Sequence, residues 1–316
     1  MEFVIALLGL VILVLAGDSL VRGAVNVSLR LGVPALIVSL TIVAIGTSAP
    51  ELLIAINAVL EHAPGLAIGN VVGSNTANVL LVLGLPALLA GLKTSEIDTR
   101  QGFVQMLAAT ALFVAIALLQ PITWVHGVIL FGVYCAILGH AAHKARTHRR
   151  EVAAAFDDLD EVEGADPDMP WWRIGLYLVM GLIGLPLGAE LLVDASTEIA
   201  RAYNISETVI GLTLVAIGTS LPELATTIAA AYRRQADVAI GNVIGSNIAN
   251  LLAIIGIASF FGDIPVARAV MQFDLWVMVG ASVLLVPFVF WRINITRLWG
   301  GVLTTLYAVY LIIVLI

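Results

Sequence analysis

The chain has 316 residues, of which 60% are hydrophobic and 12% are charged, and its mean hydropathy is +1.05. A soluble globular domain carries roughly twice that charged fraction, so the composition excludes one and indicates a membrane protein. The net charge of −7 identifies no partner, because seven acidic side chains lie between residues 157 and 168. The basic residues sit mainly at the ends of apolar segments, so we expect no nucleic-acid partner.

Apolar runs of about 20 residues, the length of a membrane-spanning helix, recur along the whole chain. They predict an all-α integral membrane protein with ten transmembrane helices. The predicted ranges are 3–23, 35–60, 65–90, 102–119, 122–142, 172–195, 207–231, 237–260, 273–291 and 297–316. The first run lacks a cleavage pattern, so we expect it to be a retained helix and not a signal peptide.

Lysine and arginine residues gather on one side of this predicted topology. If the N-terminus is outside, thirteen of them fall at inner loops and helix ends, and only Arg201 and Arg268 fall outside. Positively charged loops tend to stay in the cytoplasm. We therefore expect a multi-pass protein of the plasma (inner) membrane, with both termini outside and segment 143–171 in the cytoplasm.

Two sequence motifs each occur twice. The stretch TIVAIGTSAPELL begins at Thr41 and returns as TLVAIGTSLPELA from Thr213. The stretch AIGNVVGSNTAN begins at Ala67 and returns as AIGNVIGSNIAN from Ala239. Both copies follow their originals at the same distance along the chain, and this shared offset indicates duplication of a whole unit.

Each unit contains five predicted helices, and an odd number reverses the second unit in the membrane. The sequence therefore predicts two inverted five-helix halves, over 1–142 and 172–316, joined by an acidic cytoplasmic linker over 143–171. Inverted repeats are the usual construction of secondary transporters, in which the binding site lies near the middle of the membrane.

The first motif places helix-breaking and polar residues inside an apolar segment. Pro50 has no N–H group, so the carbonyl of Gly46 loses its helical partner, and we expect the helix to kink or break there. Pro222 and Gly218 repeat this arrangement in the second half. Free backbone oxygen at membrane depth is tolerated only where protein or a polar cavity satisfies it.

Polar side chains in both motifs fall on shared helix faces. Thr47 and Ser48 precede Glu51 by four and three residues, so their oxygens converge beside the predicted break. In the second motif Ser74 and Asn78 are four residues apart and share a face, as do Ser246 and Asn250. Carboxylates, hydroxyls and amides are hard oxygen donors, which suit Ca²⁺ and Na⁺ and not Zn²⁺ or copper.

The motifs VAIGTSAPE with GNVVGSNTAN, and VAIGTSLPE with GNVIGSNIAN, resemble the two α-repeats of the cation/Ca²⁺ exchanger superfamily, specifically prokaryotic sodium/calcium exchangers. This resemblance covers essentially the full chain. It implies an antiporter that exchanges Na⁺ for Ca²⁺ by alternating access, normally extruding Ca²⁺, with Glu51 and Glu223 as the central Ca²⁺ carboxylates. The other implied ligands are Thr47, Ser48, Ser74, Asn78, Thr219, Ser220, Ser246 and Asn250, with the backbone oxygens of Ala44 and Ala216.

Other interpretations make different predictions. A Ca²⁺/H⁺ antiporter is the alternative within transporters, because buried glutamates can exchange protons for metal. A channel would use a symmetric oligomeric pore. Two sets of oxygen donors within one chain, one from each repeat, fit a channel less well. No nucleophile–base pair or cofactor fingerprint is present, so we expect neither an enzyme nor a cofactor. The expected partners are Ca²⁺, Na⁺, H⁺ in the alternative, and the lipid bilayer, with no obligatory protein partner.

Some acidic residues fit a structural role better than a transport role. Asp18 and Glu190 are also related by the offset of the repeat, but Arg22 follows Asp18 by one helical turn. We therefore expect an ion pair or gating contact at Asp18. For Glu51 and Glu223 the structural alternative is a carboxylate hydrogen-bonded between helices, and the cost of a charge at membrane depth favours the transport role. The resemblance departs at Asn250, where several family members carry aspartate.

Overall fold

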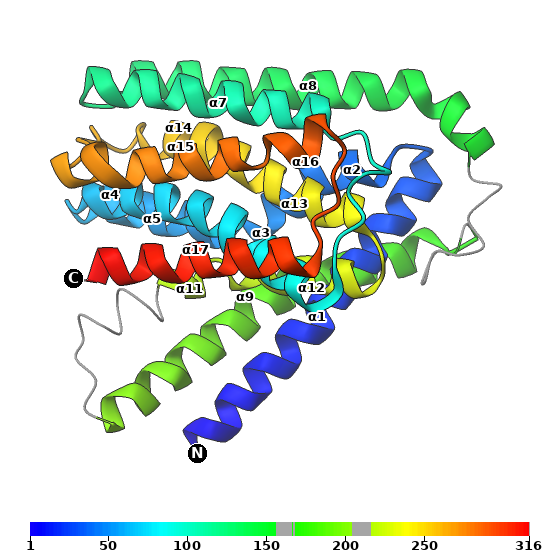
Figure 1. Ribbon diagram of the computed structural model, residues 1–316, viewed down its shortest axis with the longest axis horizontal. Helices are drawn as coiled ribbons and strands as arrows, with labels where there is room; N and C mark the ends of the chain where they lie inside the picture. Colours follow the sequence, from blue (N-terminus) through cyan, green and yellow to red (C-terminus); the bar gives the residue numbers. More distant parts are fainter. Residues whose placement is uncertain (156–165, 167, 204–215, 316) are drawn as a thin grey trace.

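The computed structural model describes residues 1–155, 166, 168–203 and 216–315, and the chain is helical in nearly all of them (Figure 1). The longer helices are α1 (Glu2–Leu31), α4 (Ala49–Leu60), α5 (Pro64–Ala77), α7 (Arg100–Leu119), α8 (Trp124–Ala155), α9 (Trp171–Ala202), α12 (Leu221–Tyr232), α13 (Ala236–Ile248), α15 (Leu275–Leu284) and α17 (Arg297–Leu315). Shorter helices are α2 (Ala35–Val38), α3 (Ala44–Thr47), α6 (Gly84–Ala90), α11 (Ala216–Gly218), α14 (Ile255–Ala258) and α16 (Val286–Phe290). Wider π-helical turns are η1 (Ser39–Val43), η2 (Asn78–Val82), η5 (Ala249–Ile254) and η6 (Val270–Asp274).

Eight helical segments among the described residues are long and apolar enough to cross a membrane. A ninth is present if the bent pair Ala35–Thr47 and Ala49–Leu60 counts as one span. The predicted span 207–231 falls partly outside the described residues, and only its second part, α11 and α12, is seen. The structure is therefore an all-helical membrane protein.

Several helices run past the ends of the predicted spans. The first was predicted to end at residue 23, yet α1 continues to Leu31. Hydropathy marks the part of a helix that lies in lipid, whereas the helix ends at its cap. Here the cap is Gly32, which has left-handed backbone angles (φ 63°, ψ 44°) and whose N–H reaches back to the carbonyl of Leu29.

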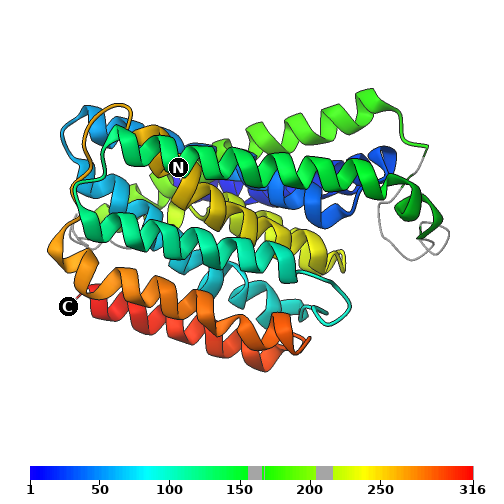
Figure 2. The ribbon, with the colours of Figure 1, turned by 90° about the horizontal axis from the view of Figure 1, so that it is seen from above.

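Two helices stand apart from the rest in orientation. In Figure 1, α1 and α9 run obliquely beneath the other long helices, which lie close to parallel with one another. They pack closely because small residues meet at the crossing: a Cβ added to Gly181 would lie 2.5 Å from Cβ of Leu20. Figure 2 shows α15 and α17 along the opposite edge of the molecule.

The buried apolar residues form two separate clusters. The larger cluster draws on α4 to α8 and α12 to α17, and it also includes Val21 and Val25 of α1. The smaller one lies mainly between α1 and α9 and contains Leu13, Ala16, Leu20, Ala24, Val27, Val33, Val38, Val43, Met169, Ile174, Leu185 and Ala189. Helices α1 and α9 thus supply most of the smaller cluster, while one face of α1 also packs into the larger one.

Helix α13 lies at the centre of the larger body. Twelve of its thirteen residues are buried, and it packs against η1, α2, α3, α7 and α12. Glycine allows this close approach, because a Cβ on Gly245 would lie 2.5 Å from the carbonyl oxygen of Leu40. Segments far apart in the sequence therefore meet around α13.

Short bridges also join the two sides of the chain. Leu92 pairs in an antiparallel bridge with Ile295, and Ile122 pairs in the same way with Ile264. The loops between helices are thus tied across the midpoint of the sequence.

Candidate functional site

Both copies of the first motif interrupt a helix at a serine. Ser48 lies between α3 and α4 with φ −86° and ψ 9°, and the two flanking segments meet at 44°. Ser220 precedes α12 with nearly the same backbone angles, φ −88° and ψ 2°. In each copy the proline, Pro50 or Pro222, falls in the first turn of the following helix, where a missing N–H is tolerated. The predicted break near Gly46 and Pro50 is confirmed.

The breaks place one carboxylate from each copy in the protein interior. Glu51 and Glu223 lie in the first turns of α4 and α12, and each is only 1% exposed. The Ser48 hydroxyl donates a hydrogen bond of 3.1 Å to Oε1 of Glu223. The two predicted halves of the site are therefore brought together.

Asn242 links the first break to the second. Its Oδ1 accepts a hydrogen bond of 3.3 Å from the Thr47 hydroxyl. Its Nδ2 donates to the Thr227 hydroxyl and to the backbone oxygen of Glu223, at 3.3 and 3.4 Å. This amide holds α3 and α12 together beside the carboxylates.

Four asparagines form a crossed set of hydrogen bonds between the second motifs. Nδ2 of Asn78 donates to Oδ1 of Asn247, and Nδ2 of Asn250 donates to Oδ1 of Asn75, each at 3.0 Å. Asn78 starts η2 and Asn250 lies in η5, so each stands where the helix widens. Such π-helical turns are frequent at functional sites.

Many oxygens at this location have no hydrogen-bond partner among the described residues, although they are fully buried. They are Glu51 Oε2, Asn78 Oδ1, Ser220 Oγ, Glu223 Oε2, Ser246 Oγ and Asn250 Oδ1. An unpaired buried polar atom is costly, and a charged one costs far more. Bound cations are the partners that such oxygens could accept.

Each remaining predicted site residue has an observed position. Ser74 is buried in α5, and the half-buried Thr219 lies between α11 and α12. The Ala44 carbonyl accepts hydrogen bonds from the Ser48 N–H and, at 3.3 Å, from the Thr47 hydroxyl. Ala216 is the first residue of α11.

Three further residues lie at this location although they are not among the predicted ligands, namely Asn75, Asn242 and Asn247. The available signal was the repeat itself, because Asn75 and Asn247 occupy equivalent positions in the two copies and follow Ser74 and Ser246 directly. Asn242 likewise matches Asn70 at the offset of the repeat. The repeat shows that an asparagine recurs at a position, but it does not show which residues the amide of that asparagine contacts.

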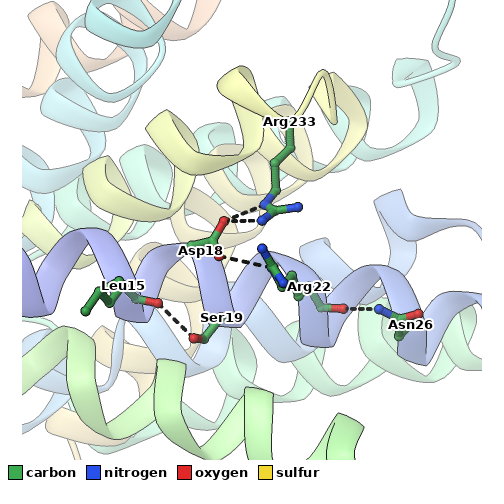
Figure 3. Close-up of polar contacts among 6 residues, drawn as sticks. All are labelled: Leu15, Asp18, Ser19, Arg22, Asn26 and Arg233. Atoms are coloured by element: carbon green, nitrogen blue, oxygen red, sulfur yellow. Dashed lines mark hydrogen bonds and ion pairs between the residues drawn. The ribbon is translucent and has the colours of Figure 1, made fainter. Parts of the chain in front are cut away.

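A cluster of charges lies away from these oxygens (Figure 3). Asp18 and Arg22, one turn apart on α1, form the predicted ion pair, with 3.0 Å between Oδ2 and Nε. Oδ1 of Asp18 also lies 2.5 Å from nitrogens of Arg233, which directly follows α12. Asp18 therefore ties α1 to α12 and has its charge matched, which favours a structural role over a transport role.

The arrangement as a whole can hold hard cations. Its ligands would be two carboxylates, several hydroxyls and two amide oxygens, and these are the donors that Ca²⁺ prefers. With both glutamates ionised the site carries a charge of −2, which one Ca²⁺ would balance. The candidate ligands come from both halves of the sequence, so neither half alone provides a complete site.

Comparison with known proteins gives consistent matches over most of the chain. A family model described as sodium/calcium exchanger protein matches residues 1–142 and 174–316. The sodium/calcium exchanger MaX1 of Methanosarcina acetivorans is 36% identical over 344 residues, covering 99% of this chain and 98% of that protein. The vacuolar calcium ion transporter of Schizosaccharomyces pombe is 26% identical over 222 residues, covering 64% of this chain and 52% of that protein.

Solved structures match equally well. The structure of the sodium-calcium exchanger NCX_Mj soaked with 2.5 mM Na⁺ and 0.1 mM Ca²⁺ has a TM-score of 0.80 and 33% sequence identity to this chain. The match covers 98% of this chain and 96% of that chain. The chain therefore has both the sequence pattern and the fold of these proteins.

Proposed function

Because the chain belongs to the sodium/calcium exchanger protein family, a family of transporters, we propose that it is a secondary antiporter that exchanges Na⁺ for Ca²⁺. It is a multi-pass membrane protein, and ion exchange requires no covalent chemistry from its side chains. The observation that carries the proposal is the set of buried, unpaired oxygens gathered around Glu51 and Glu223.

The two glutamates are the central Ca²⁺ carboxylates in this proposal. The hydroxyls of Thr47, Ser48, Ser74, Thr219, Ser220 and Ser246, the amides of Asn78 and Asn250, and the backbone oxygens of Ala44 and Ala216 complete the Ca²⁺ and Na⁺ sites. Two carboxylates balance one Ca²⁺. More than two Na⁺ in its place would leave a positive site, so exchange would respond to membrane voltage.

The proposed mechanism is alternating access between two inverted five-helix halves. In support, the two breaks at Ser48 and Ser220 have matching backbone angles, and the two crossed asparagine bonds are counterparts of each other in the repeat, each running from the last asparagine of one motif copy to the middle asparagine of the other. We place the protein in the plasma membrane, with both termini outside the cell and segment 143–171 in the cytoplasm. This orientation follows from the distribution of lysine and arginine. In that orientation an inward Na⁺ gradient would drive Ca²⁺ out.

The test is Ca²⁺ uptake into proteoliposomes that contain the purified chain, with Na⁺, H⁺ and K⁺ gradients imposed separately at clamped voltage. We expect uptake into Na⁺-loaded vesicles, persisting without K⁺ because the site has no further carboxylate to bind it, and changing with voltage. Protein-free vesicles are the control. Uptake driven by a proton gradient and indifferent to Na⁺ would instead establish Ca²⁺/H⁺ exchange.

A further inference from the structure

The crossed hydrogen bonds determine which atom of the Asn78 and Asn250 amides is left without a partner among the described residues. A backbone carbonyl can only accept a hydrogen bond, and Nδ2 of Asn75 lies 3.2 Å from the backbone oxygen of Asn247. This contact fixes the Asn75 amide, so its Oδ1 is the atom that meets Asn250. Asn250 must therefore use Nδ2 in that bond, and its Oδ1 turns away.

The other side is fixed by a different contact. Nδ2 of Asn247 lies 3.6 Å from the sulfur of Met106, which is a weak acceptor and cannot donate. Oδ1 of Asn247 is therefore left to accept the bond from Nδ2 of Asn78. As a result, the amide oxygens of both Asn78 and Asn250 are buried without a hydrogen-bond partner among the described residues.

From this geometry we propose that Asn75 and Asn247 are positioning residues, which turn the amide oxygens of Asn250 and Asn78, and not their NH₂ groups, toward the bound cations. The inference rests on the proposed function. An amide with its oxygen and nitrogen exchanged would direct the positive end of its dipole at a cation and lose one ligand. Each positioning residue lies in the opposite motif copy from the residue it orients, so the two copies determine each other's ligands.

Removing Asn75 or Asn247 should lower Ca²⁺ affinity by as much as removing other residues that orient a metal ligand without touching the metal. Removing such a residue typically costs about 10–100-fold in metal affinity. The backbone of η2 and η5 would stay in place, because the helices around Asn75 and Asn247 are held by apolar packing within the larger cluster. Affinity should therefore change much more than folding.

The experiment is a double-mutant cycle read by Ca²⁺ binding to the purified protein and by exchange in proteoliposomes. Asn247→Leu has a similar volume but no acceptor for Asn78, so we expect Ca²⁺ binding to weaken at least tenfold and the KM of exchange to rise in parallel. In the Asn78→Ala background the same substitution should weaken binding less than twofold. Asn247→Asp keeps the acceptor and adds negative charge beside Asn78, so it should not show the loss of Ca²⁺ affinity expected of Asn247→Leu.

The matched control is Thr76→Val. Thr76 is fully buried beside Asn75, but its hydroxyl bonds only the Val72 carbonyl of its own helix, at 3.0 Å. Its replacement should leave Ca²⁺ affinity unchanged. If Asn247→Leu does not fold, as judged by thermal unfolding, the equivalent cycle of Asn75→Leu with Asn250→Ala tests the same relationship.

The outcomes separate this inference from the proposed function. If the wild-type chain neither binds nor exchanges Ca²⁺, the proposed function is wrong. If the wild-type chain is active but the two substitutions in the cycle have additive effects on affinity, Asn247 does not act through Asn78 and the inference is overturned. Loss of binding in Asn247→Asp equal to that in Asn247→Leu would also overturn it.

Discussion

The hydroxyl of Ser48 lies 3.1 Å from Oε1 of Glu223, although 175 residues separate them in the chain. Ser48, at the first helix break, thus holds the carboxylate of Glu223, which follows the second helix break. The equivalent serine, Ser220, has no hydrogen-bond partner at Oγ among the described residues. The two buried carboxylates are therefore supported differently in this conformation, even though their sequence surroundings are nearly the same.

Neutralising either carboxylate should abolish exchange. Glu51→Gln or Glu223→Gln would leave one positive charge of a bound Ca²⁺ uncompensated in a buried site, at a cost of about 3–5 kcal/mol or more. We expect Ca²⁺ exchange in proteoliposomes to fall at least about 100-fold. The exposed Glu96 provides the control, since Glu96→Gln should exchange at the wild-type rate. Near-normal exchange by both buried-site variants would show that these carboxylates do not bind Ca²⁺.

A single methyl group on Gly245 should separate the central helix from the first break. Its Cβ would lie 2.5 Å from the Leu40 carbonyl oxygen and 2.6 Å from Cβ of Ala44, and backbone cannot yield as a side chain can. Overpacking of this kind costs about 1–3 kcal/mol. We expect Gly245→Ala to lower both the melting temperature and the rate of Ca²⁺ exchange, the latter by about tenfold.

The control for this substitution is Gly132→Ala. Gly132 lies in α8, and no described atom lies within 4 Å of its added Cβ. Alanine there raises helix propensity by about 1 kcal/mol, so stability should be equal or higher and exchange unchanged. If Gly245→Ala left the melting temperature and the exchange rate as unchanged as Gly132→Ala does, the close packing of α13 against Leu40 and Ala44 would not be needed for stability or exchange.

Removing the charge of Asp18 should weaken the joint between α1 and α12. The Asp18 and Arg22 side chains are 37% and 39% exposed, so solvent screens their pair, whereas the Arg233 side chain is only 10% exposed. We expect Asp18→Asn to destabilise the protein by about 1–2 kcal/mol and to lower the melting temperature in detergent by a few degrees.

Glu198→Gln is the comparison for Asp18→Asn, because its pair with Arg201 is 47–56% exposed and should contribute little. High salt should shrink the difference between wild type and Asp18→Asn. An unchanged melting temperature for Asp18→Asn would mean that the three-residue cluster does not stabilise the fold.

A third carboxylate in the site should link exchange to protons. Asn250 donates from Nδ2 to Oδ1 of Asn75, and an aspartate at position 250 could make that bond only when protonated. Asn250→Asp would therefore favour the protonated form at low pH, with a site charge of −2, and reach −3 as pH rises. Relative to wild type, its affinity for cations should therefore increase as the pH rises.

This pH dependence is measured as the ratio of variant to wild-type KM for Ca²⁺ over a series of pH values. Asn57→Asp, on an exposed position of α4, is the control and should keep a constant ratio. A constant ratio for Asn250→Asp as well would show that position 250 is not coupled to the cations.

The sequence predicted those parts of the site that depend on local chemistry. Pro50 and Pro222 determine where a helix must be interrupted, and the interruptions occur there. The pairing of Asp18 with Arg22 follows from their spacing on one helix. The contact of Asp18 with Arg233 spans 215 residues and depends on how α1 packs against α12, which no local pattern encodes. The crossed amides depend in the same way on the approach of α5 to η5 and of η2 to α13.

The separate hydrophobic cluster of α1 and α9 has a consequence for how the protein opens. Neither helix carries a proposed cation ligand, and most of the buried apolar residues that they share belong to the smaller cluster, with only Val21 and Val25 of α1 in the larger one around α13. Cooperative units of unfolding tend to follow such boundaries. Amide hydrogens in α1 and α9 should therefore exchange with solvent deuterium as one group, at a rate different from that of α13, and Ca²⁺ should slow exchange chiefly in the helices that bind it.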